Sequence, residues 1–165
     1  CQLGKCVAVT LQEGEGVWAP PRTTPLPGSP FGLACGDLDG DEQPDLVVSL
    51  YKAEGLQLLR GDGKGAFVLV GSVRMPASSL GLALADADQD GDLDILAANE
   101  HTQALHVFEN QGRSTFAEAI RLGTGGPAYA LAVVDLDGAG VPDVIVTNGS
   151  NNELAVISLR KGLLE

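Results

Sequence analysis

The chain has few aromatic, basic and cysteine residues. Phe, Trp and Tyr make up 4% of its 165 residues, and ten Lys and Arg stand against 22 Asp and Glu, so the formal net charge is −12. This charge argues against nucleic acid or an acidic membrane surface as a partner and is compatible with a cation. No apolar run approaches the length of a membrane-spanning helix, so no membrane span is expected.

Three cysteines are too few for a disulfide framework, and their odd number leaves at least one unpaired. Cys1 and Cys6 are close enough in sequence to form a disulfide in an oxidising compartment, or they remain free thiols. A lipid on Cys1, as in bacterial lipoproteins, is a further alternative. Cys35 lies in the apolar run FGLACGD and is expected to be a small core residue.

Glycine and proline are frequent, and an internal repeat is present. The 22 glycines and 9 prolines suit many short strands joined by turns. Residues recur 49 positions apart with no insertion: Asp37, Asp86 and Asp135; Leu33, Leu82 and Leu131; Trp18, Phe67 and Phe116. A period near 50 with strand-like segments indicates the blades of a propeller or a related array.

Each repeat is predicted to hold four antiparallel strands. In the middle copy these are residues 80–85, 94–99, 104–110 and 116–122, each bounded by Gly, Asn, Asp or Pro. The predicted fold is all-β, with about 3.4 repeats: a part blade (1–30), two blades (31–79 and 80–128) and another part blade (129–165). Propellers close with about 4–8 blades, so we expect further blades in a longer array, or a ring completed by self-association.

Aspartates are concentrated in three windows of nine residues, DLDGDEQPD, DADQDGDLD and DLDGAGVPD. Asp stands at positions 1, 3 and 9 of each window and at position 5 of the first two, while position 7 varies, as expected of a residue that contributes its backbone carbonyl. Such alternate oxygens suit calcium, which takes six to eight of them. The candidate ligands are Asp37, Asp39, Asp41, Gln43 and Asp45; Asp86, Asp88, Asp90, Asp92 and Asp94; and Asp135, Asp137, Val141 and Asp143.

Two alternatives, an EF-hand and a metal-free turn, fit the three windows less well than a calcium-binding loop between strands. An EF-hand needs a bidentate Glu at position 12 and flanking helices, whereas position 12 here is Val48, Ala97 or Val146 and the flanks are strand-like. A metal-free turn rich in Asp and Gly would not require three copies in register. Ala139 replaces the fifth-position aspartate of the third window, so we expect two full calcium sites and a weaker third one.

These residues resemble the FG-GAP repeat family, also called VCBS, which forms the blades of the integrin alpha-subunit propeller. The resemblance rests on FGLACGDLDGDEQPDLVVS, LGLALADADQDGDLDILAAN and YALAVVDLDGAGVPDVIVTN and covers essentially the whole chain. It implies a β-propeller with calcium between the first and second strands of a blade. It also implies an extracellular or secreted protein, at the cell surface or in the periplasm, with roles in adhesion, protein contact and, in some members, sugar binding.

No motif of an enzyme is visible, so catalysis is not expected. The two histidines, His101 and His106, fall in a turn and a strand, where ordinary surface or neighbour contacts account for them. The predicted function is a calcium-binding module for extracellular protein interaction or adhesion, with a lectin-like sugar binder as the alternative. The rim opposite the calcium loops is expected to display a candidate ligand surface: Tyr51, Lys52, Asn99, Glu100, His101, Tyr129, Asn148, Asn151 and Asn152. Asn148-Gly149-Ser150 also matches the N-glycan acceptor pattern.

Overall fold

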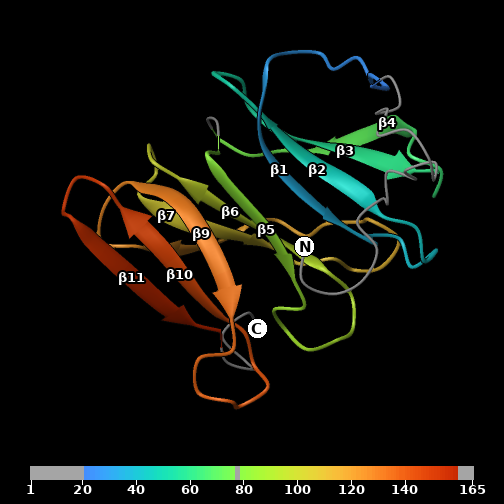
Figure 1. The fold of residues 1–165 in the computed structure, drawn as a ribbon. Helices are drawn as coiled ribbons and strands as arrows, with labels where there is room; N and C mark the ends of the chain where they lie inside the picture. Colours follow the sequence, from blue (N-terminus) through green and yellow to red (C-terminus); the bar gives the residue numbers. More distant parts are fainter. Residues whose placement is uncertain (1–20, 77–78, 160–165) are drawn as a thin grey trace, which may run out of the picture.

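Three antiparallel sheets make up the described part of the chain, which comprises residues 21–76 and 79–159 of a computed structural model (Figure 1). No helix occurs in these residues, and the all-β prediction is confirmed. The first sheet contains β1 (Pro30–Gly36), β2 (Asp45–Leu50), β3 (Leu56–Gly61) and β4 (Phe67–Val73). The second sheet contains β5 (Gly81–Ala85), β6 (Asp94–Asn99), β7 (Ala104–Phe108) and β8 (Ile120–Gly123). The third sheet contains β9 (Ala128–Val134), β10 (Asp143–Asn148) and β11 (Glu153–Ser158).

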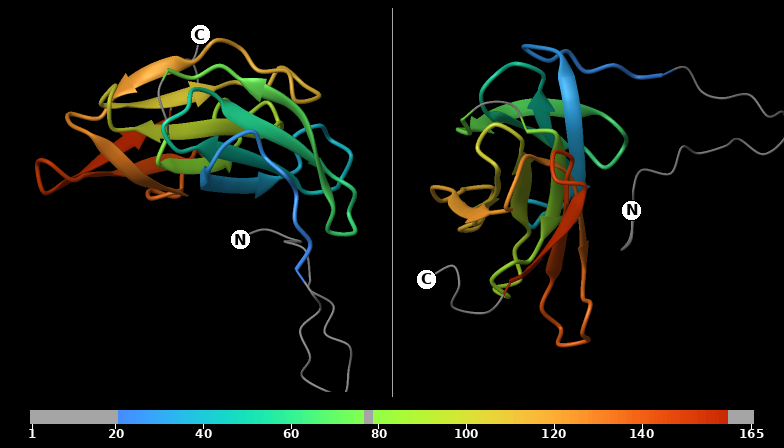
Figure 2. Two further views of the ribbon diagram at one scale, coloured as in Figure 1. Left: turned by 90° about the horizontal axis from the view of Figure 1, so that it is seen from above. Right: turned by 90° about the vertical axis from the view of Figure 1, so that its left-hand side faces the viewer.

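The sheets are stacked as successive layers, and the array is open rather than closed into a ring (Figures 1 and 2). Within each sheet the strands follow one another in chain order, as in a propeller blade. The first strands of the three sheets are neighbours, with β5 lying between β1 and β9. The same edge of every sheet therefore faces the same way, and the loops that follow the three first strands lie at one end of the stack.

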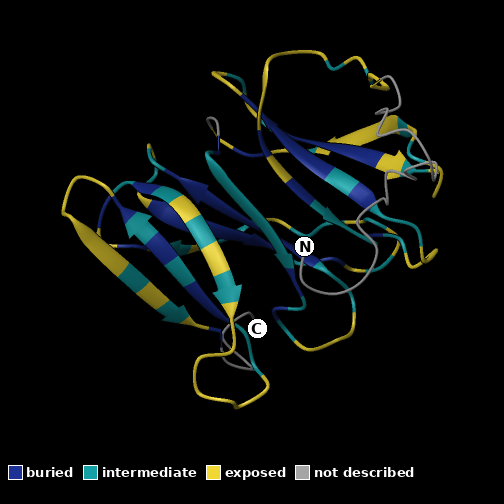
Figure 3. Cartoon of the chain, viewed as in Figure 1, coloured by how far each residue is buried: buried dark blue, intermediate teal, exposed yellow. Residues whose placement is uncertain are grey.

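The core consists of two apolar layers between the sheets. Val47, Leu56 and Leu58 of the first sheet pack with Ile95 and Phe108 of the second. A second cluster joins the other face of the second sheet to the third: Leu96, Ala98, Leu105 and Val107 pack with Val144 and Val146. The second sheet is thus covered on both sides, and all residues of β6 and β7 are buried (Figure 3). This explains why the sequence of β6 is continuously apolar rather than alternating.

Glycine permits the close approach of neighbouring first strands. A Cβ atom at Gly81 of β5 would lie 2.8 Å from the carbonyl oxygen of Tyr129 in β9, closer than real contacts allow. At the equivalent position of the first sheet, a Cβ at Gly32 would lie 2.8 Å from the Ser49 hydroxyl and 3.1 Å from the Leu80 carbonyl oxygen. A side chain at either position would push adjacent sheets apart.

The fourth strand of the middle repeat differs from the prediction. It begins at Ile120 rather than at 116, and Phe116 makes only an isolated bridge to Asn110. The reason is local: Arg113 and Ser114 both have positive φ, 54° and 56°, so the chain leaves the sheet before it returns. The third strand also ends earlier, at Phe108.

The cysteine predictions are tested only at Cys35. Cys1, Cys6 and most of the expected first part blade lie outside the described residues. Cys35 is half-buried and carries a free thiol, and burial, followed by the charge of Asp45, raises its pKa. A thiol with a raised pKa is poorly nucleophilic at neutral pH, so Cys35 behaves as a small packing residue.

Candidate metal-binding loops

The three aspartate windows form loops between the first and second strands of each sheet. Three carboxylates in each loop place one oxygen apiece within 4.8 Å of one another. We call these groups the aspartate triads: Asp37, Asp39 and Asp41; Asp86, Asp88 and Asp90; and Asp135, Asp137 and Asp143. Nine of the fourteen candidate ligands therefore lie in the triads, and their binding of a metal ion remains a prediction.

Backbone N–H groups fix the first aspartate of each window. In the second loop, Asp86 Oδ1 accepts a hydrogen bond from the N–H of Asp90 at 3.0 Å, and Oδ2 accepts one from Gly91 at 3.1 Å. The same pattern holds Asp37 and Asp135. The sixth position needs a left-handed backbone: Gly91 has φ 100°, and Glu42 takes φ 64° at the same place in the first loop. The loop therefore tolerates a side chain where the sequence favoured glycine.

The ninth-position aspartate connects the loop to the end of the third strand in the first sheet, and to a residue just beyond that strand in the second. Asp94 is fully buried, and its two carboxylate oxygens accept hydrogen bonds from the N–H groups of Ala87, at 2.7 Å, and Asn110, at 2.8 Å. Asp45 makes the same pair of bonds, to Leu38 and Gly61. Burial raises the pKa of Asp94 to about 6, although the two N–H donors oppose the shift. Asp45 and Asp94 lie outside the triads of their loops, whereas Asp143 belongs to the third triad.

The triads are chemically suited to a hard cation. All donors are carboxylate oxygens, which calcium and magnesium prefer over nitrogen or sulfur ligands. Burial raises the pKa of Asp88, and the negative charges of Asp90 and Asp86 raise it further. A bound cation would offset this repulsion. Five of the predicted ligands are not part of a triad: Gln43, Asp45, Asp92, Asp94 and Val141.

A comparison with known protein families supports the 49-residue repeat of the sequence. The model of the FG-GAP-like repeat matches residues 37–97 and 86–146, so the two overlapping matches together cover about two thirds of the chain. The chain belongs to the FG-GAP-like repeat family. FG-GAP-like repeats occur in extracellular or periplasmic proteins and are generally non-enzymatic. None of the curated proteins compared with the chain matches it. In the described residues, there is no helix with the length and apolarity that a bilayer crossing requires.

Asn110 connects two FG-GAP-like repeats and was not singled out by the sequence. Its buried Nδ2 group donates to the carbonyl oxygen of Leu38, in the first aspartate loop, at 2.9 Å and to that of Leu93, in the second loop, at 3.2 Å. The residues 49 positions away are Gly61 and Leu159, which have no comparable side chain. The contact therefore breaks the repeat, and periodicity alone could not reveal it.

Only part of the candidate ligand surface, expected on the rim opposite the aspartate loops, is exposed in the structure. Asn99 is fully buried, and its side chain bonds the Pro76 carbonyl oxygen and the N–H groups of His101 and Thr102. Asn148 is also buried, and its Nδ2 group donates to the Thr124 carbonyl oxygen. The prediction that these two asparagines face a ligand is wrong, because they fix turns. A buried, hydrogen-bonded Asn148 is likewise unsuited to carry a glycan.

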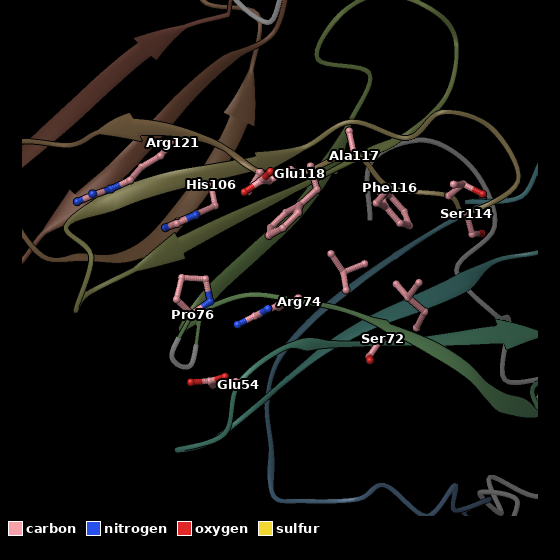
Figure 4. Close-up of a pocket in the computed structure, with 15 residues that line it drawn as sticks. Glu54, Ser72, Arg74, Pro76, His106, Ser114, Phe116, Ala117, Glu118 and Arg121 are labelled. Atoms are coloured by element: carbon pink, nitrogen blue, oxygen red, sulfur yellow. The ribbon is translucent and has the colours of Figure 1, made fainter.

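A groove of about 1100 Å³ separates the outer parts of the first and second sheets (Figure 4). His106 of β7 lies on one side, and Arg74, which follows β4, lies on the other. Phe108 of β7 also lines the groove. His106 is 4% exposed, and its Nε2 atom lies 2.8 Å from the Thr102 hydroxyl. Burial, and then the charge of Arg121, lowers the pKa of His106, so the imidazole is neutral at pH 7.

Proposed function

We propose that this chain is a calcium-binding, non-catalytic module of the β-propeller type that serves protein interaction or adhesion outside the cytoplasm. One observation carries the proposal: three loops each gather three aspartate oxygens within 4.8 Å, at the same point of each sheet. Membership of a family found in extracellular or periplasmic proteins supports the location. Calcium is abundant there, and the ion would serve to hold the loops rather than to react.

The expected energetic effect of calcium is modest at each site. Extracellular modules bind calcium with dissociation constants of about 10⁻⁴–10⁻³ M. At about 1 mM free calcium, each filled site then adds about 0.4–1.4 kcal/mol to the free energy of unfolding by mass action. For a domain of this size, each 1 kcal/mol raises the melting temperature by about 2–4 °C. Two filled sites would therefore raise it by roughly 2–11 °C.

Thermal unfolding in calcium and in a chelator tests the proposal. We expect a higher melting temperature in about 1 mM calcium than in the chelator, and a smaller rise in magnesium, which demands tighter octahedral geometry. Native mass spectrometry should show two bound calcium ions, with a third at higher concentration. Equal melting temperatures in calcium and chelator would contradict the proposal.

Matched variants locate the ions. Asp90→Ala gives the second loop the fifth-position alanine that the third loop has naturally at Ala139, and should reduce the calcium-induced rise in melting temperature. The reciprocal change, Ala139→Asp, completes the carboxylate set of the third loop and should increase that rise. Glu118→Gln removes a negative charge outside the triads and serves as the control for net charge. An equal loss of the calcium response in Asp90→Ala and Glu118→Gln would mean that the triads do not bind the ion.

The partner we propose is a protein rather than a sugar. The loops YKAE, NEHTQ and NGSNNE differ between repeats, whereas repeated sugar sites would need similar residues. Tyr51 is half-exposed, with the Lys52 ammonium 5.1 Å from the centre of its ring, and exposed aromatic side chains are enriched at protein interfaces. A glycan array separates the alternatives: reproducible sugar binding would favour the lectin, and its absence together with protein capture would favour the protein partner.

A further inference from the structure

In the first two sheets the aspartate loop is hydrogen-bonded to the chain at the end of the third strand. In the first sheet the N–H of Gly61 donates to Asp45 at 2.9 Å. In the second sheet the N–H of Asn110 donates to Asp94 at 2.8 Å. The residue before each of these N–H groups is therefore close to the loop. We call its register position the loop neighbour, and its charge differs between the three repeats: Arg60, Glu109 and Ser158.

Two arginines lie beside the first loop. A cavity of about 370 Å³ is lined by Asp39 of the first triad, by Arg60 of β3 and by Arg113 of the second repeat. The N–H of Ser114 donates to the Leu38 carbonyl oxygen at 3.1 Å, and this bond holds the segment that carries Arg113 against the loop. Within the residues that the structure describes, neither guanidinium forms an ion pair with Asp39. The carboxylate therefore stays available to a cation, but positive charge is close to it.

A carboxylate takes the corresponding place at the second loop. Glu109 is partly buried and directly follows β7. Burial raises the pKa of Glu109, and the negative charges of Asp88 and Asp90, two members of the second triad, raise it further. The segment that follows Glu109 lies along the same loop, since a Cβ at Gly112 would be 3.8 Å from a carboxylate oxygen of Asp92. The second triad therefore has a further negative charge beside it.

We propose that charged side chains outside the aspartate windows set the order in which the loops bind calcium, and that the second loop binds it more tightly than the first. Both triads hold three aspartates, so the windows alone predict equal sites. Arg60 and Arg113 repel a cation that approaches the first loop, whereas Glu109 attracts one to the second. The inference rests on the proposed function, and it adds the residues that make the sites unequal.

The size of the effect follows from Coulomb's law and from screening by salt. At an ionic strength of about 0.01 M the Debye length is about 30 Å, so a unit charge about 10 Å from a divalent cation changes its dissociation constant about threefold. Reversal of that charge changes the dissociation constant about eightfold. At about 1 M salt the Debye length falls to about 3 Å, and the effect should disappear.

Calcium titration of the 165-residue chain, followed by NMR, tests each loop separately. The N–H groups of Gly40, Gly91 and Gly138 each donate to the first aspartate of their own loop, so their signals report the filling of the first, second and third sites. At an ionic strength of about 0.01 M, the Gly91 signal should reach its midpoint at a calcium concentration severalfold lower than the Gly40 signal does.

Variants of the loop neighbour should move one midpoint and leave the other. Glu109→Gln should raise the calcium midpoint of Gly91 about threefold, and Glu109→Arg about eightfold, without a change at Gly40. Arg60→Gln should lower the midpoint of Gly40 about threefold without a change at Gly91. Arg60 is exposed and Glu109→Gln keeps the size of the side chain, so both variants should fold, which circular dichroism checks.

Glu118→Gln and Arg74→Gln are the matched controls, because they change the net charge equally at the groove between the first two sheets rather than at a loop. Both should leave the midpoints unchanged. Equal midpoints for the first two loops, equal shifts in Glu109→Gln and Glu118→Gln, or a difference that persists at about 1 M salt would overturn this inference and leave the proposed function intact. No calcium-dependent shift at any loop would overturn both.

Discussion

Replacing Asn110 with alanine tests how the second sheet is joined to the first aspartate loop. The side chain makes three hydrogen bonds: Nδ2 donates to the carbonyl oxygens of Leu38 and Leu93, and Oδ1 accepts from the N–H of Gly112 at 3.2 Å. Alanine removes all three and keeps the backbone bond from residue 110 to Asp94. Because Leu38 lies between two residues of a triad, the change also affects the position of the first loop.

The cost of Asn110→Ala follows from these bonds. A net contribution of about 0.5–1.5 kcal/mol for each intramolecular hydrogen bond gives a total of about 1.5–4.5 kcal/mol. The side chain is 2% exposed, so water cannot readily replace the lost donors. Urea unfolding followed by circular dichroism should show a lower midpoint with an unchanged slope, which indicates lost stability rather than a changed denatured state.

Gln111→Ala is the matched control for Asn110→Ala. Gln111 is exposed and adjacent in sequence, and surface substitutions of this kind usually change stability by less than about 0.5 kcal/mol. The Asn110 variant should therefore be clearly less stable than the Gln111 variant and should respond less to calcium. If the two variants unfold at the same urea concentration, Asn110 does not connect the two repeats as described.

Two further predictions concern glycine and histidine. Gly81→Ala should lower stability by about 1–3 kcal/mol, because its methyl group would meet the Tyr129 carbonyl oxygen, whereas Gly71→Ala, with open space around it, should have little effect in the same urea titration. Burial lowers the pKa of His106 in the folded chain, so protonation of the imidazole favours the unfolded chain. The contribution of His106 to stability is therefore fully present above the pKa of the unfolded chain, about 6.5, and is lost as the pH falls below that value. His106→Gln, which introduces the amide found at the equivalent Gln57, should lose less stability between pH 7 and pH 5 than the unmodified chain; an equal loss would exclude this role.

Features with a local sequence signal were predicted well. The second strands are short apolar runs that begin at an aspartate, and β6 begins and ends where its sequence predicts. In the first two triads the carboxylates lie close together because alternate residues of a tight turn face the same side, whereas the third triad takes Asp143 from the end of its window. The burial of β6 between two neighbouring sheets was also predictable, because a strand with a continuous apolar run has no face suited to water.

Features that leave no distinct signal in the local sequence were not predictable. The left-handed backbone at Arg113 and Ser114 is not marked by glycine at either position, so the predicted start of β8 is too early. Asparagines at the ends of strands look alike in sequence whether they face water or fix a buried turn, and only the structure shows that Asn99 and Asn148 do the latter. The exposure of Leu154 depends on which sheet lies beside it, and the sequence of β11 does not contain that information.

The aspartates of each window have two separate physical roles. Those of the first two triads lie at the more accessible end of the loop, where a cation would relieve the repulsion between them. The ninth aspartate is buried and, in the first two loops, holds the loop to the rest of its sheet through backbone N–H groups. The third loop combines these roles in one residue, because Ala139 removes a carboxylate while Asp143 accepts a hydrogen bond from the N–H of Leu136 and also enters the triad. A loop can therefore keep its shape after it has lost part of its capacity for a cation, and an aspartate-rich repeat indicates the fold more directly than it indicates the number of bound ions.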